Sequence, residues 1–168
     1  MIPTIAENRR SIISTIDITP ILVDPGLFAQ ACDDIYQMYE REVFDIIITT
    51  KLSGTVFAAA LATRMGKGLI ITTCVKPTDG YLTEEIEGNS SSFSVGMPEG
   101  FIGKGTKAVV VVDQISHGRD IKAAINMVEK QGGTVIKVSG FVEVSEINAR
   151  KKAIKGYPVE SRLFTEDF

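Results

Sequence analysis

From residue 24 onward the chain alternates between short runs of β-branched residues and stretches with α-helical periodicity, and this alternation constrains the fold more than any other feature. The β-branched runs are too short for helices and contain few polar residues, which is typical of strands buried on both faces. We predict strands at residues 45–48, 69–73, 109–112 and 134–142, and a last one that ends near Phe164. Because helical stretches separate these runs, the connections should be right-handed crossovers. The pattern therefore predicts a doubly wound α/β fold with a mostly parallel, five-stranded sheet.

Capping signals mark where the helices begin and end. Asp24 is a good N-cap, and Pro25 follows it at the first helical position, where its missing N–H costs nothing. Gly66 and the pair Gly132-Gly133 are typical of helix C-termini. The predicted helices cover residues 25–40, 56–65, 121–131 and, as a short one, 145–154.

Residues 76–105 do not fit the alternation. Prolines and glycines interrupt this segment repeatedly, and its periodicity is weak. A segment of this length is either a mobile functional loop or a weak antiparallel hairpin.

The overall composition narrows the classes of function. A chain of 168 residues fits one domain, residues 1–168. Its net charge of −3 and pI of about 5.3 argue against a nucleic-acid partner bound through a basic face. The longest wholly apolar run, residues 56–62, is far shorter than a bilayer span, so we expect no membrane partner. With no apolar signal sequence in residues 1–20 and two isolated cysteines, we expect reduced thiols and a cytoplasmic location.

In such sheets ligands bind beyond the carboxyl ends of the strands, so residues 49–55, 74–84 and 113–120 are the candidate site. The third segment is the most informative, because Asp113 directly follows a run of four valines and stands at the start of a turn that leads into a helix. A carboxylate there can meet ribose hydroxyls or a hydrated metal ion. The turn can meet a phosphate through backbone N–H groups at the helix N-terminus. A plainer interpretation, in which Asp113 only starts the turn and caps the helix, remains open.

Two other sequence features argue against a zinc site and against a nucleotide-binding P-loop. His117 is the only histidine, which excludes a histidine-rich zinc site and favours a surface or phosphate-contacting role over general-base catalysis. Residues 103–106 read GKGT, but they precede a strand instead of a helix, unlike a nucleotide-binding P-loop.

Several segments, in order, resemble the type I phosphoribosyltransferases, and most closely the adenine phosphoribosyltransferases. The resemblance covers nearly the whole chain from about residue 12. It rests on residues 17–22 (DITPIL), the strand–loop–helix of 45–62, the segment 109–133, and 156–159 (GYPV) with Ser161. It implies the fold of that family, with a small N-terminal hood (mainly residues 1–25) and a flexible lid (about residues 76–105).

The resemblance also implies an activity and its partners. Enzymes of this family transfer ribose 5-phosphate from phosphoribosyl pyrophosphate (PRPP) to a purine base, release pyrophosphate and use Mg²⁺. The expected partners are therefore PRPP and a purine base or nucleotide, and the expected assembly is a homodimer. Adenine is favoured as the base, while hypoxanthine, guanine and xanthine stay open because part of the sequence also resembles xanthine phosphoribosyltransferase.

By the same resemblance, Asp113 is the expected catalytic residue and holds the ribose hydroxyls, and both Asp113 and its neighbour Gln114 are expected to bind PRPP. The expected 5′-phosphate contacts are Ser116, His117, Gly118, Arg119 and Asp120. The expected pyrophosphate loop is Thr50, Lys51, Leu52, Ser53 and Gly54, and Lys76 follows the second strand near the pyrophosphate. No metal ligand is directly assigned.

The chain departs from the family pattern in the region that binds PRPP. Gln114 stands where the family has a second acid, and Ser53 stands where it has an arginine. The phosphate turn is one residue shorter and carries Asp120, whose charge opposes a phosphate unless Arg119 offsets it. These departures favour an alternative function, a sensor of the same fold that binds a nucleotide or PRPP without turnover.

Overall fold

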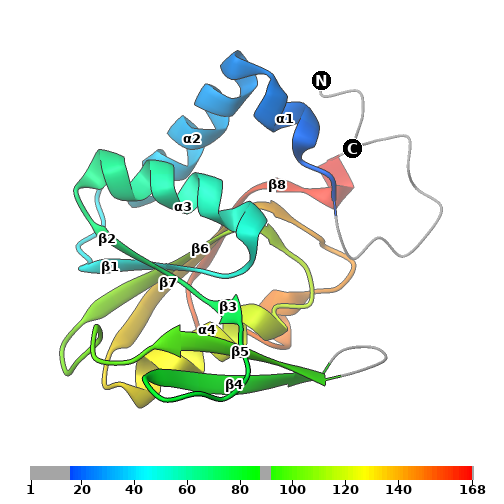
Figure 1. Cartoon of the computed structure of the whole chain (residues 1–168). Helices are drawn as coiled ribbons and strands as arrows, with labels where there is room; N and C mark the ends of the chain where they lie inside the picture. The colour runs from blue at the N-terminus through cyan, green and yellow to red at the C-terminus, as the bar shows by residue number, and fades with distance from the viewer. Residues whose placement is uncertain (1–15, 88–91, 168) are drawn as a thin grey trace.

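The computed structural model describes residues 16–87 and 92–167, and its centre is a five-stranded parallel sheet (Figure 1). The strands lie in the order β2-β1-β6-β7-β8. Their bounds are β1 Ile46–Thr49, β2 Gly68–Ile71, β6 Lys107–Ile115, β7 Thr134–Glu143 and β8 Val159–Phe164. The predicted doubly wound, five-stranded sheet is therefore confirmed. Most of the expected hood, residues 1–15, lies outside the described residues.

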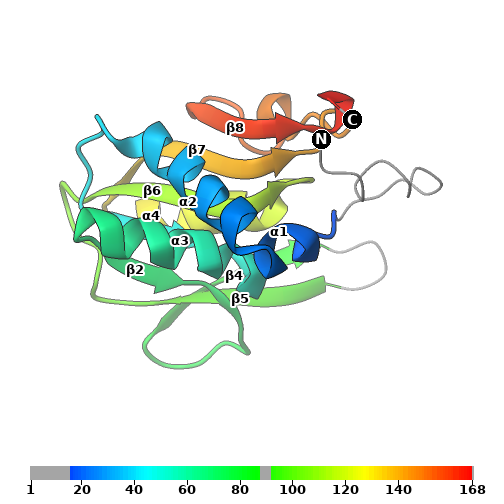
Figure 2. The ribbon, with the colours of Figure 1, turned by 90° about the horizontal axis from the view of Figure 1, so that it is seen from above.

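Helices cover both faces of this sheet (Figures 1 and 2). One face carries α1 (Thr19–Val23), α2 (Pro25–Tyr39) and α3 (Lys51–Met65), and the other carries α4 (Arg119–Lys130). As predicted, the Asp24 carboxylate caps α2 by accepting from the N–H groups of Gly26 and Leu27 at 2.9 Å. None of the helices in the described part of the chain is both long enough and apolar enough to cross a bilayer.

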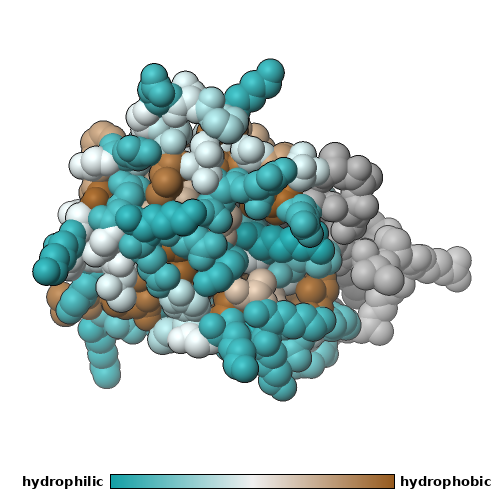
Figure 3. All heavy atoms as spheres, turned by 90° about the horizontal axis from the view of Figure 1, so that it is seen from below, coloured by the Kyte–Doolittle hydropathy of each residue, from teal (hydrophilic) through white to brown (hydrophobic). Residues whose placement is uncertain are grey.

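A second, antiparallel sheet packs against α4. Its strands lie in the order β3-β5-β4, with β3 at Thr73–Cys74, β4 at Tyr81–Glu87 and β5 at Ser92–Pro98. Of the two interpretations of residues 76–105, the antiparallel hairpin is thus correct. Seen from below, the face formed by this sheet and α4 is mostly hydrophilic, with scattered apolar side chains (Figure 3).

The central strands contribute side chains to two hydrophobic cores, one on each face of the sheet. In β6, Val109 and Val111 pack toward α1, α2 and α3, whereas Val110 and Val112 pack toward α4 and the second sheet. This alternation follows from the period of two of a strand, and it explains why the run of valines has no polar interruption.

Three predicted boundaries are wrong. Helix α3 begins at Lys51 instead of Val56, so residues 51–54 of the expected pyrophosphate loop form its first turn. Strand β6 continues past Asp113 to Ile115. The expected short helix at 145–154 is only a 3₁₀ turn, Ala149–Lys151, because Asn148 at its start adopts the left-handed conformation (φ 56°), which does not continue a helix.

Candidate active site

The carboxyl ends of β1 and β6 lie close together, and Gly54 lets the first turn of α3 approach both of them closely. A Cβ atom at Gly54 would lie 2.8 Å from Thr49 Oγ1 and 3.3 Å from the backbone N of Asp113. Only a glycine permits this approach, although it weakens the interior of a helix. The structure therefore brings the expected pyrophosphate segment and Asp113 together.

Asp113 is buried inside β6, two residues before the strand ends. The N-cap of α4 is Gly118, and no side chain caps that helix. The interpretation in which Asp113 only caps the helix is therefore wrong. A buried carboxylate at this edge of a parallel sheet is placed where such sheets bind ligands.

The turn that follows β6 contains Ser116, His117 and Gly118, of which Ser116 is buried and His117 half-buried. Gly118 adopts the left-handed conformation with φ 72°. A Cβ atom on it would lie 3.3 Å from the Cβ atoms of both Ala149 and Ala153. The segment after β7 therefore supports the turn from behind.

Asp120, in the first turn of α4, joins this turn to α3. The Thr50 hydroxyl donates to Asp120 Oδ2 at 2.9 Å, and Thr50 is the N-cap residue of α3. A carboxylate at the N-terminus of α4 also interacts favourably with the helix dipole. The two segments predicted to hold phosphate groups are thus linked by one hydrogen bond.

Arg119 turns toward the second sheet. Its Nη1 donates to the backbone carbonyl of Glu87 at the end of β4. The guanidinium lines a depression of about 270 Å³ together with Lys122 and glutamates of β4. The contact between Arg119 and a phosphate stays a prediction.

The remaining predicted residues lie at different places. Leu52 and Ser53 are exposed on the first turn of α3. Lys76 is exposed after β3 and lines a separate depression of about 300 Å³ with Cys74 and Ser94. Their roles toward PRPP stay predictions.

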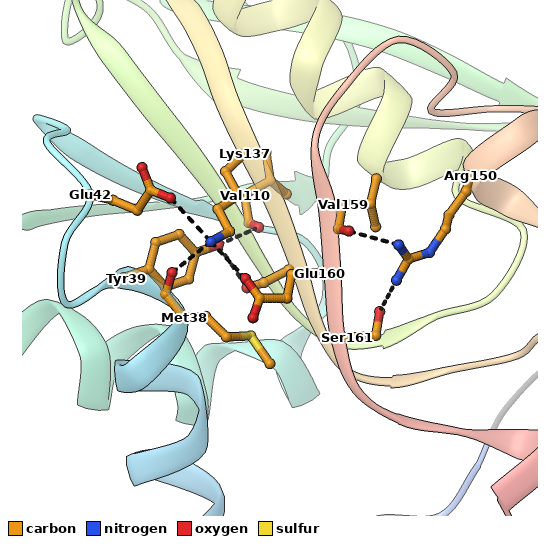
Figure 4. Close-up of polar contacts among 10 residues, drawn as sticks. Met38, Tyr39, Glu42, Val110, Lys137, Arg150, Val159, Glu160 and Ser161 are labelled. Atoms are coloured by element: carbon orange, nitrogen blue, oxygen red, sulfur yellow. Dashed lines mark hydrogen bonds and ion pairs between the residues drawn. The ribbon is translucent and has the colours of Figure 1, made fainter.

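Two contacts at this edge were missed by the sequence reasoning. The side-chain carbonyl of Gln114 accepts a hydrogen bond from the backbone N–H of Ile16 at 2.7 Å. Arg150 Nε donates to both carboxylate oxygens of Glu143, at 2.7 and 2.8 Å. The same guanidinium donates to Val159 O and Ser161 Oγ, as Figure 4 shows. Neither has a local sequence signal, although Ser161 stood in the segment that carried the resemblance.

No group of three or more His, Cys, Asp or Glu side chains that could hold a metal ion occurs within residues 16–87 and 92–167. Near Asp113, the only other carboxylate of the turn is that of Asp120. A metal at this edge would therefore need ligands from a substrate as well as from the protein.

Comparison with known proteins assigns the family. The chain is 33% identical to adenine phosphoribosyltransferase from Kosmotoga olearia over 148 residues, which cover 86% of this chain and 85% of that protein. It is 34% identical to the Acetivibrio thermocellus enzyme over 151 residues, 89% and 88% of the two chains. This chain belongs to the adenine phosphoribosyltransferase family. No protein-family model matches it.

A solved structure supports the assignment. Adenine phosphoribosyltransferase from Thermoanaerobacter pseudethanolicus superposes with a TM-score of 0.83 at 28% identity, covering 89% of this chain and 87% of that one. The Saccharomyces cerevisiae enzyme, at 23% identity and a TM-score of 0.79, shares the fold. The type I phosphoribosyltransferase fold predicted from the sequence is confirmed.

Proposed function

We propose that this protein transfers ribose 5-phosphate from PRPP to a purine base, adenine by preference, and releases pyrophosphate. The observation that carries the proposal is the position of Asp113. Its buried carboxylate lies at the carboxyl edge of the sheet, beside the first turn of α3 and just ahead of the turn into α4, in a member of the adenine phosphoribosyltransferase family.

The chemistry demands little from a general acid or base. A purine nitrogen forms a bond to C1 of the ribose and loses its proton to solvent, while the bond from C1 to the pyrophosphate oxygen breaks and its electron pair leaves with the pyrophosphate. Positive charge builds on the ribose in between. Asp113 supplies a negative charge that stabilises this charge and a hydrogen-bond acceptor that orients the ribose hydroxyls. Its burial strengthens both effects.

The two helix N-termini supply the anion sites. Backbone N–H groups of Ser116 to Gly118 and of the start of α4 hold the 5′-phosphate, and those of the first turn of α3 hold the pyrophosphate. The family resemblance adds Lys76 as a further pyrophosphate contact. When the 5′-phosphate arrives, Asp120 keeps its hydrogen bond to Thr50, and this bond turns its carboxylate toward α3.

Mg²⁺ fits this arrangement as an ion brought in by the substrate. It usually keeps several waters and binds through one or two carboxylates plus phosphate oxygens, so Asp113 and PRPP are a sufficient ligand set. When bound, the ion neutralises charge on the departing pyrophosphate.

A direct assay tests the proposal. The protein is incubated with PRPP, Mg²⁺ and, separately, adenine, hypoxanthine, guanine and xanthine, and the nucleotide and pyrophosphate are measured. We expect equimolar formation of both, fastest with adenine. No nucleotide with any base would overturn the proposal.

The variant Asp113→Asn tests the role of the carboxylate. It keeps the size of the side chain and removes the charge, so the rate should fall on the order of a hundredfold or more, with little change in thermal stability. A folded variant with unchanged rate would remove Asp113 from the reaction.

A second candidate function is a sensor of PRPP or a nucleotide without turnover. It is favoured by the internal hydrogen bonds of Asp120 and Gln114, two of the residues that depart from the family pattern. Calorimetric binding of PRPP or a nucleotide 5′-monophosphate, together with no product in the assay above, would select the sensor.

We also propose a homodimer with an interface beside the site. Leu52 is 86% exposed on the first turn of α3, the turn whose Gly54 approaches the backbone of Asp113. Sedimentation at micromolar concentration should show a dimer, and Leu52→Glu should shift it toward the monomer.

A further inference from the structure

The two helices that begin at the candidate site lie on opposite faces of the central sheet (Figure 1). Helix α3 packs into one hydrophobic core through Phe57 and Leu61, and α4 packs into the other through Ile121 and Ile125. Among the residues that the structure describes, the two cores share none, so packing within either core does not set the distance between the two helix N-termini. That distance depends on the sheet and on contacts that cross its carboxyl edge.

One contact that crosses this edge is the hydrogen bond from the Thr50 hydroxyl to Asp120 Oδ2, at 2.9 Å. Thr50 is buried directly before α3, and Asp120 is half-buried as the second residue of α4. Both side chains are short, and an O–H group that donates to a carboxylate makes one of the stronger hydrogen bonds of proteins. The bond therefore holds the two helix N-termini at a defined separation.

This bond leaves the start of each helix without a side-chain cap. A threonine before a helix commonly accepts from backbone N–H groups of the first turn, but the Thr50 side chain makes no such bond. Helix α4 has no side-chain cap either, because its N-cap residue is Gly118. The N–H groups of these two first turns are the ones that the proposed function assigns to the pyrophosphate and to the 5′-phosphate.

We propose that Thr50 and Asp120 are positioning residues that set the spacing of the two anion sites, and that this spacing selects PRPP over ligands with a single anionic group. This inference rests on the proposed function. The ribose of PRPP fixes the separation of the 5′-phosphate and the pyrophosphate, so both sites are filled by one molecule only when their spacing matches. Ribose 5-phosphate and free pyrophosphate each fill one site, and their binding does not depend on the spacing. The bridging ligand gains affinity because its second contact is intramolecular.

The same bond gives a role to Asp120, the acid that departs from the family pattern. Its charge would oppose a phosphate at the start of α4, but its carboxylate accepts from a side chain that belongs to the other helix layer. A hydrogen bond to a charged acceptor is stronger than one between neutral groups. Asp120 therefore makes a firmer link between the two N-termini than an uncharged acceptor would.

Two variants of Thr50 separate the hydrogen bond from the shape of the side chain. Thr50→Val keeps the shape and removes the donor, whereas Thr50→Ser keeps the donor. The matched control is Thr63→Val, because the Thr63 hydroxyl donates to the backbone carbonyl of Ala59 at 2.9 Å within α3 and so links no second element.

The first measurement is calorimetric titration with PRPP, ribose 5-phosphate and pyrophosphate, each with Mg²⁺ and without a purine base. Thr50→Val should weaken PRPP binding on the order of tenfold and the binding of each single-anion ligand by less than about threefold. Thr50→Ser and Thr63→Val should keep all three affinities close to those of the wild type. Equal weakening of PRPP and ribose 5-phosphate in Thr50→Val would overturn the proposal, because a merely structural role moves both.

The second measurement is steady-state kinetics with PRPP and adenine varied separately. Thr50→Val should raise the KM for PRPP on the order of tenfold and leave the KM for adenine nearly unchanged. If the wild type forms nucleotide and Thr50→Val has the same KM for PRPP, the inference falls and the proposed function stands. If the wild type forms no nucleotide but shows the calorimetric pattern, the proposed transferase falls and the inference holds for a sensor of PRPP.

Discussion

Strand β7 carries an ion pair near each of its ends, and the two pairs are built in opposite ways. Figure 4 shows the pair at Lys137 and the guanidinium of Arg150 from the other pair. Near the amino end the cation is buried: the Lys137 side chain is 12% exposed, while its partners Glu42 and Glu160 are 39% and 48% exposed. At the carboxyl end the anion is buried: the Glu143 side chain is 4% exposed and its partner Arg150 is 34% exposed. Loss of the partner would leave a buried positive charge unpaired at Lys137 and a buried negative charge unpaired at Glu143.

The two cations, Lys137 and Arg150, also link different parts of the molecule. Lys137 Nζ also donates to the backbone carbonyl of Met38 at 2.6 Å and lies 5.2 Å from the centre of the Tyr39 ring, so it links α2 to β7 and, through Glu160, β7 to β8. Arg150 fastens the segment after β7, whose Ala149 and Ala153 support Gly118. Only the second pair supports the candidate site.

The largest expected effect is that of Arg150→Met. It leaves the buried Glu143 carboxylate without its cation, although Ser161 still donates to it at 2.6 Å, and breaking such a pair costs about 3–5 kcal/mol. Urea denaturation should show this loss of unfolding free energy, and the KM for PRPP should rise because the turn at Gly118 loses its support. The exposed neighbour Lys151→Met is the control and should change neither quantity.

Gly118→Ala tests the same support from the other side. The residue has φ 72°, and a Cβ atom on it would lie only 3.3 Å from the Cβ atoms of Ala149 and Ala153, so the substitution should cost about 1–3 kcal/mol. It should also raise the KM for PRPP, measured as for Arg150→Met. The exposed Gly80, with φ 80° and open space around it, is the control: Gly80→Ala should strain the backbone without changing that KM. If Gly118→Ala and Gly80→Ala changed the KM for PRPP equally, the segment after β7 would have no role in supporting the site.

Lys137→Met should cost less than Arg150→Met. The two glutamates that it releases are half-exposed and become hydrated, so the loss should be close to that of a surface pair with its hydrogen bonds, about 1 kcal/mol. Kinetic constants should stay at wild-type values. A loss as large as that of Arg150→Met would show that the exposure of the acids does not decide the cost.

The sequence predicted most of the sheet and little of what completes the site. β-branched runs and the cap at Asp24 are local signals, and they gave the parallel strands and the start of α2 correctly. The first turn of α3 was missed because a glycine in a helical pattern usually indicates the end of the helix. The reason for a glycine at position 54 is its close approach to Thr49 and the backbone of Asp113, which only the structure shows.

The polar contacts that hold the site join residues far apart in the chain. Thr50 and Asp120 are separated by 70 residues and Ile16 and Gln114 by 98, so no periodicity or spacing relates them. Arg150 and Glu143 are only 7 residues apart, but the chain between them is irregular, and its course depends on tertiary packing. For this reason the motif located Asp113 and its turn, whereas the partners of Gln114, Arg119 and Asp120 required the structure.

The smallest effect is the pH dependence contributed by Tyr39, beneath Lys137. Burial raises the pKa of this phenol above its ordinary value of 10, and its hydroxyl donates to Ser139 Oγ at 2.7 Å. The folded protein keeps the proton where the unfolded chain releases it. The resulting stabilisation is therefore complete below about pH 10 and is lost as the pH rises above that value. In Tyr39→Phe the unfolding free energy should fall by about 1 kcal/mol near neutral pH, from the lost hydrogen bond, and should then decline less steeply than in the wild type above pH 10.

Tyr157 is the control. Burial, and after it the hydrogen bond to Glu129, raises the pKa of Tyr157 to about 12 at a site on the opposite face of the sheet. Tyr157→Phe should remove a smaller part of the slope, since solvent reaches that hydroxyl. Identical slopes in the wild type and Tyr39→Phe, measured by urea denaturation between pH 9 and pH 11, would show that the Lys137 end of β7 adapts to a charged phenol, and the contrast between the two ends would then rest on Arg150 and Glu143 alone.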